Sequence, residues 1–390
     1  MAAIGWGGQN EGMKAGAISS DGDRVLGWDV LRGFCAFAVL GYHVLSWQNV
    51  AEIHTLGTYG VYIFFVLSGA SLAYAYGSTI EAKRFSMRDF LLVRYARLAP
   101  LYLLLMVVVL PWKVLQGGVS LELVIRTLAN AAFVFGFYNP ASNSMLIGGW
   151  SLGIEAIFYL AFPLLFMLAR AGRGFLLVVF AVVVQFAWIA LVFNAPGGYG
   201  ANIELYHQVP AFLAYFVSGV VLGASRRGGV KRSLHAGVGL VVLAGGFVVL
   251  ALLNPAEAGA QLTGARGALL FSLCVFLVWI SGAIRFESPV ARRAAGMLGD
   301  ATYGLYLIHP VVFFGLTYAV FPRVGVTAPA EWPLTGRLLF AAAMAVASFV
   351  LATASERYIE RPVRQKVRKR LSPRPEPALA PGSCQFASSR

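Results

Sequence analysis

Long apolar runs separated by short polar segments make up most of the chain. Ten of these runs are long enough to cross a bilayer, at residues 28–47, 57–77, 96–115, 149–169, 174–193, 207–225, 235–253, 265–283, 300–321 and 337–355. About 20 apolar residues in a helix match a hydrocarbon core of about 30 Å, and a helix pairs its own backbone polar groups there. The pattern therefore predicts an all-α, polytopic integral membrane protein with about ten transmembrane helices.

Residues 120–138 depart from this pattern. The segment is partly apolar, but it also carries Glu122, Arg126 and Asn130. Polar and charged groups are costly on a helix that faces lipid. We therefore interpret this segment as interfacial or re-entrant rather than as an eleventh span.

The distribution of basic residues predicts the orientation. With the N-terminus in the cytoplasm, 26 of the 31 Lys and Arg residues, counting Arg32 at the inner end of the first span, lie on the cytoplasmic side. Besides Arg32, these 26 lie in the N-terminal arm, in loops 78–97, 170–173, 226–232 and 284–293, and after residue 356. The five that lie outside or at the outer edge are Lys113, Arg126, Arg266, Arg323 and Arg337. Short cytoplasmic loops of membrane proteins are rich in Lys and Arg. The split predicts that both termini are cytoplasmic, whereas an eleventh span would reverse every later loop.

Composition and charge agree with this interpretation. Hydrophobic residues make up 58% of the chain and charged residues 12%, against about 25% charged residues in a soluble domain. The net charge of +14 then reflects the cytoplasmic loops and does not indicate a nucleic-acid partner. We expect a cytoplasmic arm at 1–26, a transmembrane domain at 27–365, and a tail at 366–390. The tail is first basic, which suits anionic lipid, and then rich in Pro, Ala and Ser, which predicts disorder.

Three ionisable residues interrupt the first apolar run: Asp29, Arg32 and His43. Such groups at membrane depth are functional candidates by default. Asp29 and Arg32 are i,i+3 neighbours that can pair, although such a pair can also serve only to anchor the helix. His43 lies three turns and about 16 Å further along, on nearly the same face. It is either a catalytic group near the midplane or a hydrogen-bonded core histidine.

A second polar face begins the run at 149–169. Ser151, Glu155 and Tyr159 recur every four residues and share one side of the helix. Glu155 then lies about 8 Å in from the outer surface, which brings it within about 6 Å of the depth of His43. These depths predict a base-and-orienter pair between Glu155 and His43. The alternative is a structural glutamate that is hydrogen-bonded between helices.

Arg94 and Arg97 stand one turn apart at the mouth of the third span. Guanidinium groups form paired hydrogen bonds with phosphate and pyrophosphate. The two arginines therefore predict a phosphate-binding site at the cytoplasmic face. The alternative is an ordinary positively charged inner loop.

Tyr303, Tyr306 and His309 recur every three residues in the run at 300–321. His309 precedes Pro310, which frees a backbone carbonyl that the imidazole could bond, so a structural role is favoured. The five histidines of the chain show no HxxH or HExxH spacing, and no metal site is predicted. The small residues from Ser68 to Ser71 are interpreted as helix packing.

Five blocks along the chain, in this order, resemble the acyltransferase-3 family of bacterial membrane O-acyltransferases. They are Asp29-Val-Leu-Arg32-Gly with His43, Phe64-Phe65-Val-Leu-Ser68-Gly69, Arg94-Tyr-Ala-Arg97-Leu-Ala-Pro100, Trp150-Ser-Leu-Gly-Ile-Glu155-Ala-Ile-Phe-Tyr159, and Tyr303-Gly-Leu-Tyr306-Leu-Ile-His309-Pro310. The resemblance extends over about 27–365. It implies transfer of an acyl group, usually acetyl, from cytoplasmic acyl-CoA to a hydroxyl of an exopolysaccharide, lipopolysaccharide or similar carbohydrate.

The resemblance also implies roles for the candidate residues. Arg94 and Arg97 would bind the phosphates of CoA, with Arg32 at the CoA entrance. His43 would act as general base or carry the acyl group, and Glu155 would orient it. The supporting residues would be Asp29, Ser151, Tyr159, Tyr306 and His309. No metal is implied, the expected location is the bacterial inner membrane, and the expected partners are a carbohydrate or glycolipid acceptor and membrane lipids.

Two other functions stay open at this point. A glycan or small-molecule transporter or flippase would also have many helices and buried ionisable groups, although it would not need paired arginines beside a buried histidine. An acyltransferase that modifies a small secondary metabolite would share every feature named above. The oligomeric state is open as well.

Overall fold

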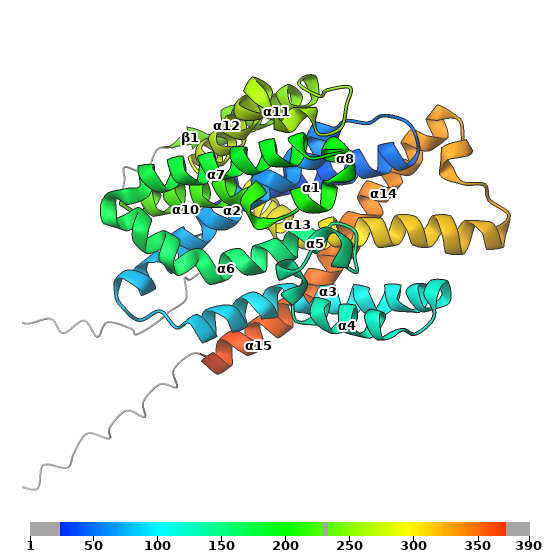
Figure 1. Ribbon diagram of the computed structural model, residues 1–390, viewed down its shortest axis with the longest axis horizontal. Coiled ribbons are helices and arrows are strands. Elements are labelled where there is room, and N and C mark those ends of the chain that lie inside the picture. The colour runs from blue at the N-terminus through cyan, green and yellow to red at the C-terminus, as the bar shows by residue number, and fades with distance from the viewer. Residues whose placement is uncertain (1–23, 229–232, 372–390) are drawn as a thin grey trace, which may run out of the picture.

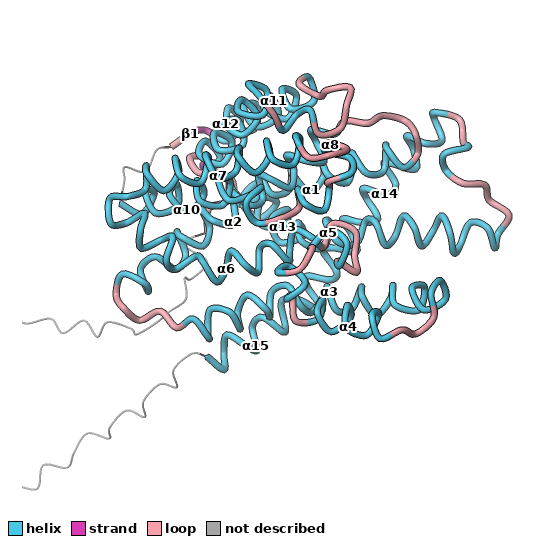
Figure 2. Tube along the Cα trace, viewed as in Figure 1, coloured by secondary structure: helices cyan, strands magenta, loops and turns pink. Residues whose placement is uncertain are grey.

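The computed structural model describes residues 24–228 and 233–371, and these residues are almost entirely helical (Figure 2). The predicted all-α class is confirmed. The exception is a pair of two-residue strands, β1 (Leu234–His235) and β2 (Ile284–Arg285), which lie parallel with Leu234 opposite Ile284. Most of the predicted N-terminal arm, and the predicted tail from residue 372 onward, lie outside the described residues.

Eight helical stretches in the described part are long and apolar enough to cross a membrane. Their main helices are α1 (Leu26–Trp47), α2 (His54–Glu81), α3 (Met87–Gly117), α6 (Trp150–Leu168), α7 (Gly174–Asn194), α10 (Leu213–Gly228), α12 (Gly264–Ser281), α13 (Pro289–Phe314) and α14 (Leu334–Ser355). Together with the shorter apolar helix α11 (Ala236–Leu252), they overlap each of the ten predicted apolar runs. The protein is therefore a multi-pass membrane protein.

One of these stretches, Trp150–Asn194, is a pair of helices and not a single one. Gly172 has a φ of +79°, a left-handed conformation that glycine adopts without steric cost. The short segment η3 (Ala169–Arg173) turns the chain there, so that α6 and α7 run back along each other (Figure 1). One of the eight long stretches is therefore two membrane-length helices joined by a turn.

Two helices begin well before the apolar runs that predicted them. α3 starts at Met87, where the Ser86 hydroxyl accepts a hydrogen bond from the Asp89 backbone N–H at 3.3 Å, and α13 starts at Pro289. Serine caps and a first-turn proline both favour a helix start. Hydropathy misses these turns because they are charged. Arg94 and Arg97 consequently lie inside α3 and not at its mouth.

The ambiguous segment 120–138 forms the short helix α4 (Leu121–Ala131), followed by η2 (Val134–Phe137) and α5 (Pro140–Asn143). The 11 residues of α4 rise only about 16 Å, which is too short to cross a bilayer, and α4 lies alongside α3 (Figure 1). Buried Asn130 anchors it, accepting from the Tyr102 hydroxyl at 2.5 Å and donating to the Asn143 carbonyl at 2.7 Å. The prediction that this segment is not a further span agrees with its length.

The core of the bundle forms around α1, which packs against α2 and α13, while α10 packs against α2 and α14 against α13. Glycines bring α2 and α10 into backbone contact. A Cβ on Gly69 would lie 2.3 Å from the Phe216 carbonyl oxygen, and one on Gly219 would lie 2.0 Å from that of Val66. Short helical turns lie in the loops between the long helices: α8 (Gly198–Ala201), α9 (Ile203–Tyr206), η4 (Val209–Phe212), η5 (Ala260–Leu262), η7 (Phe321–Val324) and η8 (Pro329–Glu331).

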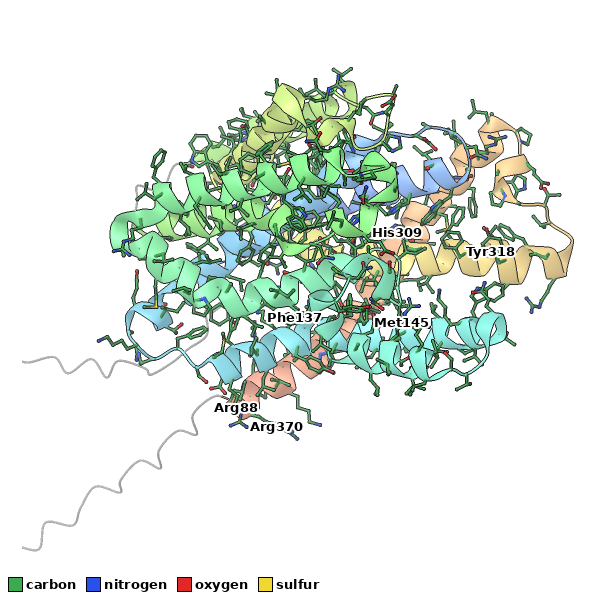
Figure 3. The ribbon with its side chains drawn as sticks, in the orientation of Figure 1. Arg88, Phe137, Met145, His309, Tyr318 and Arg370 are labelled. Atoms are coloured by element: carbon green, nitrogen blue, oxygen red, sulfur yellow. The ribbon has the colours of Figure 1, made fainter. Side chains whose placement is uncertain are left out.

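The described loops with basic residues gather at one end of the bundle. The α2–α3 loop, the α6–α7 turn and the end of α15 (Arg361–Leu371) lie on the left in Figure 1, and the α13–α14 loop lies on the right. Figure 3 shows Arg88 and Arg370 at the first end, Tyr318 at the other, and His309 between them. The basic residues 366–371, assigned to the tail from the sequence, are part of helix α15, which packs on α3.

Candidate functional site

A cavity of about 110 Å³ lies between α1, α2, α3, α6 and α13. Seven of the ten residues singled out from the sequence line it: Arg32, Arg94, Arg97, Ser151, Glu155, Tyr159 and Tyr306. The other three, Asp29, His43 and His309, are not among the lining residues. Residues from five helices, far apart in sequence, thus meet around one space.

Positive charge dominates the lining of this cavity, with three arginines against one carboxylate. Arg94 donates a hydrogen bond to the Tyr76 hydroxyl at 3.1 Å. Its guanidinium carbon lies 5.3–5.9 Å from the ring centroids of Tyr76, Phe90 and Tyr159. Its buried Nε has no hydrogen-bond partner in the described residues. Arg97 makes no hydrogen bond or ion pair within the described part of the chain. Uncompensated guanidinium groups in a partly buried cavity are suited to an anionic ligand.

Arg32 is held at the inner side of the cavity by its own helix. Its guanidinium pairs with Asp29 at 2.8 Å, so the predicted i,i+3 pair is present, and it also donates to the Ser71 hydroxyl. Asp29 is buried and pairs with Arg24 as well. Arg24 precedes the first span; burial opposes its charge, but the carboxylates of Asp29 and Asp300 outweigh burial and raise its pKa. Asp29 therefore orients two arginines rather than facing the cavity itself.

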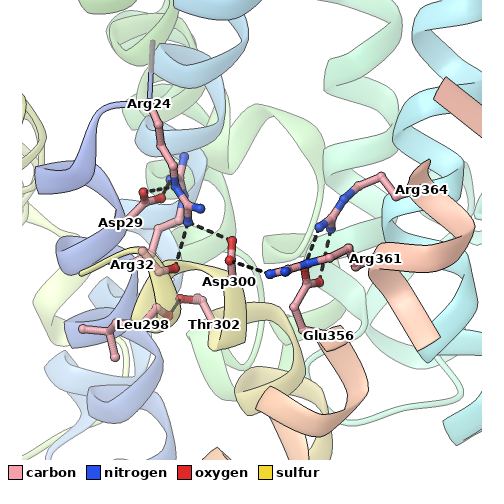
Figure 4. Close-up of polar contacts among 10 residues, drawn as sticks. Arg24, Asp29, Arg32, Leu298, Asp300, Thr302, Glu356, Arg361 and Arg364 are labelled. Carbon is pink, nitrogen blue, oxygen red and sulfur yellow. Dashed lines mark hydrogen bonds and ion pairs between the residues drawn. The ribbon is translucent and has the colours of Figure 1, made fainter. Parts of the chain in front are cut away.

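An ion-pair chain continues from Arg24 through residues before α1, in α13 and around α15 (Figure 4). Asp300 of α13 contacts Arg24 at 2.8 Å and Arg361 at 3.1 Å. Glu356, in the segment η9 (Glu356–Glu360), is buried and accepts from Arg361 at 3.3 Å and from Arg364 at 2.5 Å. Isolated surface pairs contribute little, but a connected network around a buried carboxylate fixes geometry. This network joins α1, α13 and α15 below the cavity.

The direct pair predicted between Glu155 and His43 is not formed in this structure. The Ser68 hydroxyl donates to the Glu155 carboxylate at 2.6 Å, and no hydrogen bond joins Glu155 to His43 in the described residues. Matched depth sets the height of two side chains in the membrane but not the direction in which each helix turns them. Ser68 was assigned to packing from the sequence, yet it is Gly69 and Ala70 that pack against α10, while Ser68 lines the cavity.

Ser151 and Tyr306 form the outer wall of the cavity. The Tyr306 hydroxyl lies 2.8 Å from the Gly148 carbonyl oxygen and 3.1 Å from the Ser151 hydroxyl, which is itself 3.0 Å from that carbonyl. Gly148 has a φ of +80°, and a Cβ there would lie 2.8 Å from the Tyr306 hydroxyl. This contact ties the start of α6 to the middle of α13.

His43 and His309 contact each other beyond this wall. Nδ1 of His43 lies 3.0 Å from Nε2 of His309, and Nδ1 of His309 lies 2.9 Å from the Leu305 carbonyl oxygen. Trp47 stacks on His43 with ring centroids 4.9 Å apart and an interplanar angle of 6°. His309 bonds a backbone carbonyl, that of Leu305, and its second nitrogen contacts His43. The sequence could not show this pairing, because the two residues are 266 positions apart.

The described residues contain no group of three or more His, Cys, Asp or Glu side chains that could hold a metal ion. The comparison with protein families is decisive: an acyltransferase domain matches residues 25–357. The chain belongs to the acyltransferase-3 family. The matched range runs from the start of α1 into η9, so it includes every residue of the cavity and of the histidine pair.

Named relatives of this acyltransferase-3 protein share about a quarter of its residues. "Putative peptidoglycan O-acetyltransferase YrhL" of Bacillus subtilis is 28% identical over 87% of this chain and 54% of its own length. "Exopolysaccharide production protein ExoZ" of Rhizobium meliloti is 26% identical over 83% of this chain and 94% of its own. "O-acetyltransferase OatA" of Staphylococcus aureus is 24% identical over 87% and 57%. The chain thus spans about half the length of YrhL and OatA. No solved structure matches it.

Proposed function

We propose that this protein is an inner-membrane O-acyltransferase that moves an acyl group, in the simplest case acetyl, from cytoplasmic acyl-CoA to a hydroxyl of a cell-surface or exported carbohydrate. The observation that carries the proposal is the cavity, where uncompensated arginines lie inside a matched acyltransferase domain. A flippase or transporter would not need an arginine-lined cavity whose wall residue Tyr306 stands one helical turn from His309 on α13.

Arg94 and Arg97 bind the phosphates of the donor, and Arg32 adds charge at the inner side. Arg94 and Arg97 lie in the first three turns of α3, which begins after the basic α2–α3 loop at the end of the bundle where the basic loops gather. This is the cytoplasmic end in the proposed topology of about ten crossings with both termini inside. CoA phosphates reach that end directly. The apolar part of the lining, including Phe64, Phe65 and Leu72, suits the uncharged arm that carries the thioester.

His43 acts as the general base. It takes the proton of the acceptor hydroxyl while the hydroxyl oxygen attacks the thioester carbonyl; the C–S bond then breaks, and the proton passes to the departing thiolate. His309 lies three residues beyond Tyr306 on α13, about one turn toward the outer end. The base is thus next to the donor cavity, on the side from which an exported acceptor arrives.

Glu155 acts on substrate within the cavity rather than on His43, because its hydrogen-bond partners in the described residues, Ser68 and Tyr159, both line the cavity. Asp29, Ser151, Tyr159 and Tyr306 hold the walls. The names of YrhL and ExoZ, which refer to peptidoglycan and exopolysaccharide, support a carbohydrate acceptor for this chain. The basic helix α15 rests against the anionic inner leaflet.

The test uses the full chain in liposomes that have acetyl-CoA on one side and a glycan acceptor on the other. We expect release of free CoA thiol and appearance of labelled acetyl on the glycan, each dependent on the other substrate. Movement of unmodified glycan across the bilayer, without thiol release, would instead support a transporter. Thiol release with a small secondary metabolite as acceptor, but not with any glycan, would show that the acceptor is a small metabolite rather than a carbohydrate.

A further inference from the structure

The contacts of His309 determine which of its nitrogens carries a proton. Its Nδ1 lies 2.9 Å from the Leu305 carbonyl oxygen, which can only accept a hydrogen bond. Nδ1 of His309 must therefore carry a hydrogen. His309 is only 1% exposed, and no carboxylate pairs with it in the described residues. A buried charge without a partner is costly, so the ring is neutral and its Nε2 is an acceptor.

The hydrogen between the two imidazoles then belongs to His43. Nε2 of His309, the acceptor, lies 3.0 Å from Nδ1 of His43, and a hydrogen bond at that distance needs one donor. Nδ1 of His43 supplies it. In neutral His43 the remaining nitrogen, Nε2, carries the lone pair. Trp47, parallel to the ring at 4.9 Å, fixes the plane in which that lone pair points.

We infer that His309 is a positioning residue that holds His43 in the Nδ1–H tautomer, so that Nε2 of His43 is the atom that accepts the proton of the acceptor hydroxyl. The inference rests on the proposed function, and it assigns a role to a residue that would otherwise be structural. The chain from the Leu305 carbonyl through His309 to His43 performs with a neutral ring what a carboxylate does for the histidine of a hydrolase triad.

Proton balance follows from this arrangement. As the acceptor oxygen bonds to the thioester carbon, its proton moves to Nε2 of His43; when the C–S bond breaks, the same proton moves from Nε2 to the sulfur. The hydrogen on Nδ1 of His43 stays in place throughout, and His309 neither gains nor loses a proton. The stacked Trp47 ring faces the transient imidazolium and stabilises it by a cation–π interaction.

Nitrogen-15 NMR of the histidine-labelled full chain in detergent tests the tautomer directly, because protonated and unprotonated ring nitrogens differ strongly in chemical shift. The chain has only five histidines, so His43→Gln and His309→Gln variants assign both rings. We expect protonated Nδ1 and unprotonated Nε2 in both rings of the wild type. Protonated Nε2 on His43 in the wild type would overturn the inference, without reference to any variant.

A matched pair of substitutions links the tautomer to turnover. His309→Gln can place an amide oxygen where Nε2 was and keep an acceptor for His43, whereas His309→Met has similar size and no strong acceptor. We expect His309→Met to show both tautomers of His43 and a fall in kcat of about 10²-fold, with an unchanged KM for acetyl-CoA because His309 does not line the cavity. His309→Gln should restore much of both signals.

The two proposals fail in different ways. If the wild type shows the expected tautomer but no acyl-CoA turnover with any acceptor, the proposed function is wrong. If the wild type turns over acyl-CoA and His309→Met keeps both the single tautomer and the full kcat, the role given to His309 is wrong while the proposed function stands.

Discussion

The two polar regions of this protein, the arginine-lined cavity and the histidine pair, are neighbours along α13 but differ in chemistry. The cavity holds three guanidinium groups and one carboxylate, and in the described residues two of those arginines, Arg94 and Arg97, form no ion pair. Neither His43 nor His309 forms an ion pair in the described residues, and the pair is ordered by directional contacts to a carbonyl, a second ring and an indole. Charge without a partner suits binding, and fixed hydrogen bonds suit proton transfer. The difference argues for a division between donor binding and chemistry.

The largest effect is expected when the proposed general base, His43, is removed. We expect His43→Ala to lower kcat by about 10²–10⁴-fold, the usual contribution of general base catalysis. KM for acetyl-CoA should stay the same, because His43 is not among the residues that line the cavity. Free-thiol release from purified protein with an acceptor present measures both quantities. A large rise in the KM for acetyl-CoA with a normal kcat would place His43 in donor binding. The cavity and the histidine pair would then not have separate roles.

The converse change removes charge from the cavity. We expect Arg94→Gln combined with Arg97→Gln to raise the KM for acetyl-CoA by about 10–100-fold, as for the loss of one or two hydrogen bonds to charged groups, with kcat nearly kept. Arg88→Gln is the matched control, since Arg88 is an exposed arginine on the same helix. Equal effects from both variants would mean that general surface charge, not the cavity, attracts the donor.

Dephospho-CoA, a form of the donor that lacks the 3′-phosphate, makes the same test more specific. If Arg94 and Arg97 bind phosphate, removal of the 3′-phosphate from CoA should weaken binding to the wild type and have less additional effect on the double variant. Full additivity between the ligand change and the double substitution would show that these arginines contact another part of the donor.

Helices were predictable from the sequence, whereas their facing directions were not. Each apolar run became helical because lipid requires internal backbone pairing. Hydropathy did not predict the starts of α3 and α13, because the first turns of these helices are charged. The residues that favour a helix start there, Ser86 and Pro289, are local signals that hydropathy does not measure. Arg94 and Arg97 were placed one turn apart correctly but at the wrong point of α3, two turns inside rather than at its start.

The site itself shows the same limit. Periodicity put Ser151, Glu155 and Tyr159 on one face, and the structure keeps all three in the cavity wall. Depth suggested His43 as the partner of Glu155, but depth is one coordinate of three. The actual partners, Ser68 for Glu155 and His309 for His43, come from helices whose rotation is decided by packing across the whole bundle. The spacing of Ser68 beside Gly69 was the available signal for the first, and it was interpreted as packing alone.

A smaller effect is expected from the partner of Glu155. Ser68→Ala removes the hydroxyl that donates at 2.6 Å to the only acid of the cavity. We expect a fall in kcat/KM of about tenfold, in line with one hydrogen bond to a charged group. Ser272→Ala, at an exposed serine of α12 that bonds only its own helix, is the control. An unchanged kcat/KM in Ser68→Ala would show that Glu155 needs no orientation.

The smallest effect tests the wall between the two regions. Gly148→Ala puts a Cβ 2.8 Å from the Tyr306 hydroxyl and imposes a side chain at a φ of +80°. The control Gly172→Ala imposes a side chain at a φ of +79° with no atom within 4 Å, so the comparison reports mainly the contact with Tyr306. We expect Gly148→Ala to be less stable than Gly172→Ala by about 1–3 kcal/mol, read as a lower Tm at one scan rate. Its kcat should fall while its KM for acetyl-CoA holds, because a displaced Tyr306 disturbs the passage to His43 before it disturbs the arginines. Equal Tm and kcat for the two variants would show that the contact between Gly148 and Tyr306 adjusts without cost. The cavity and the histidine pair would then be one continuous site.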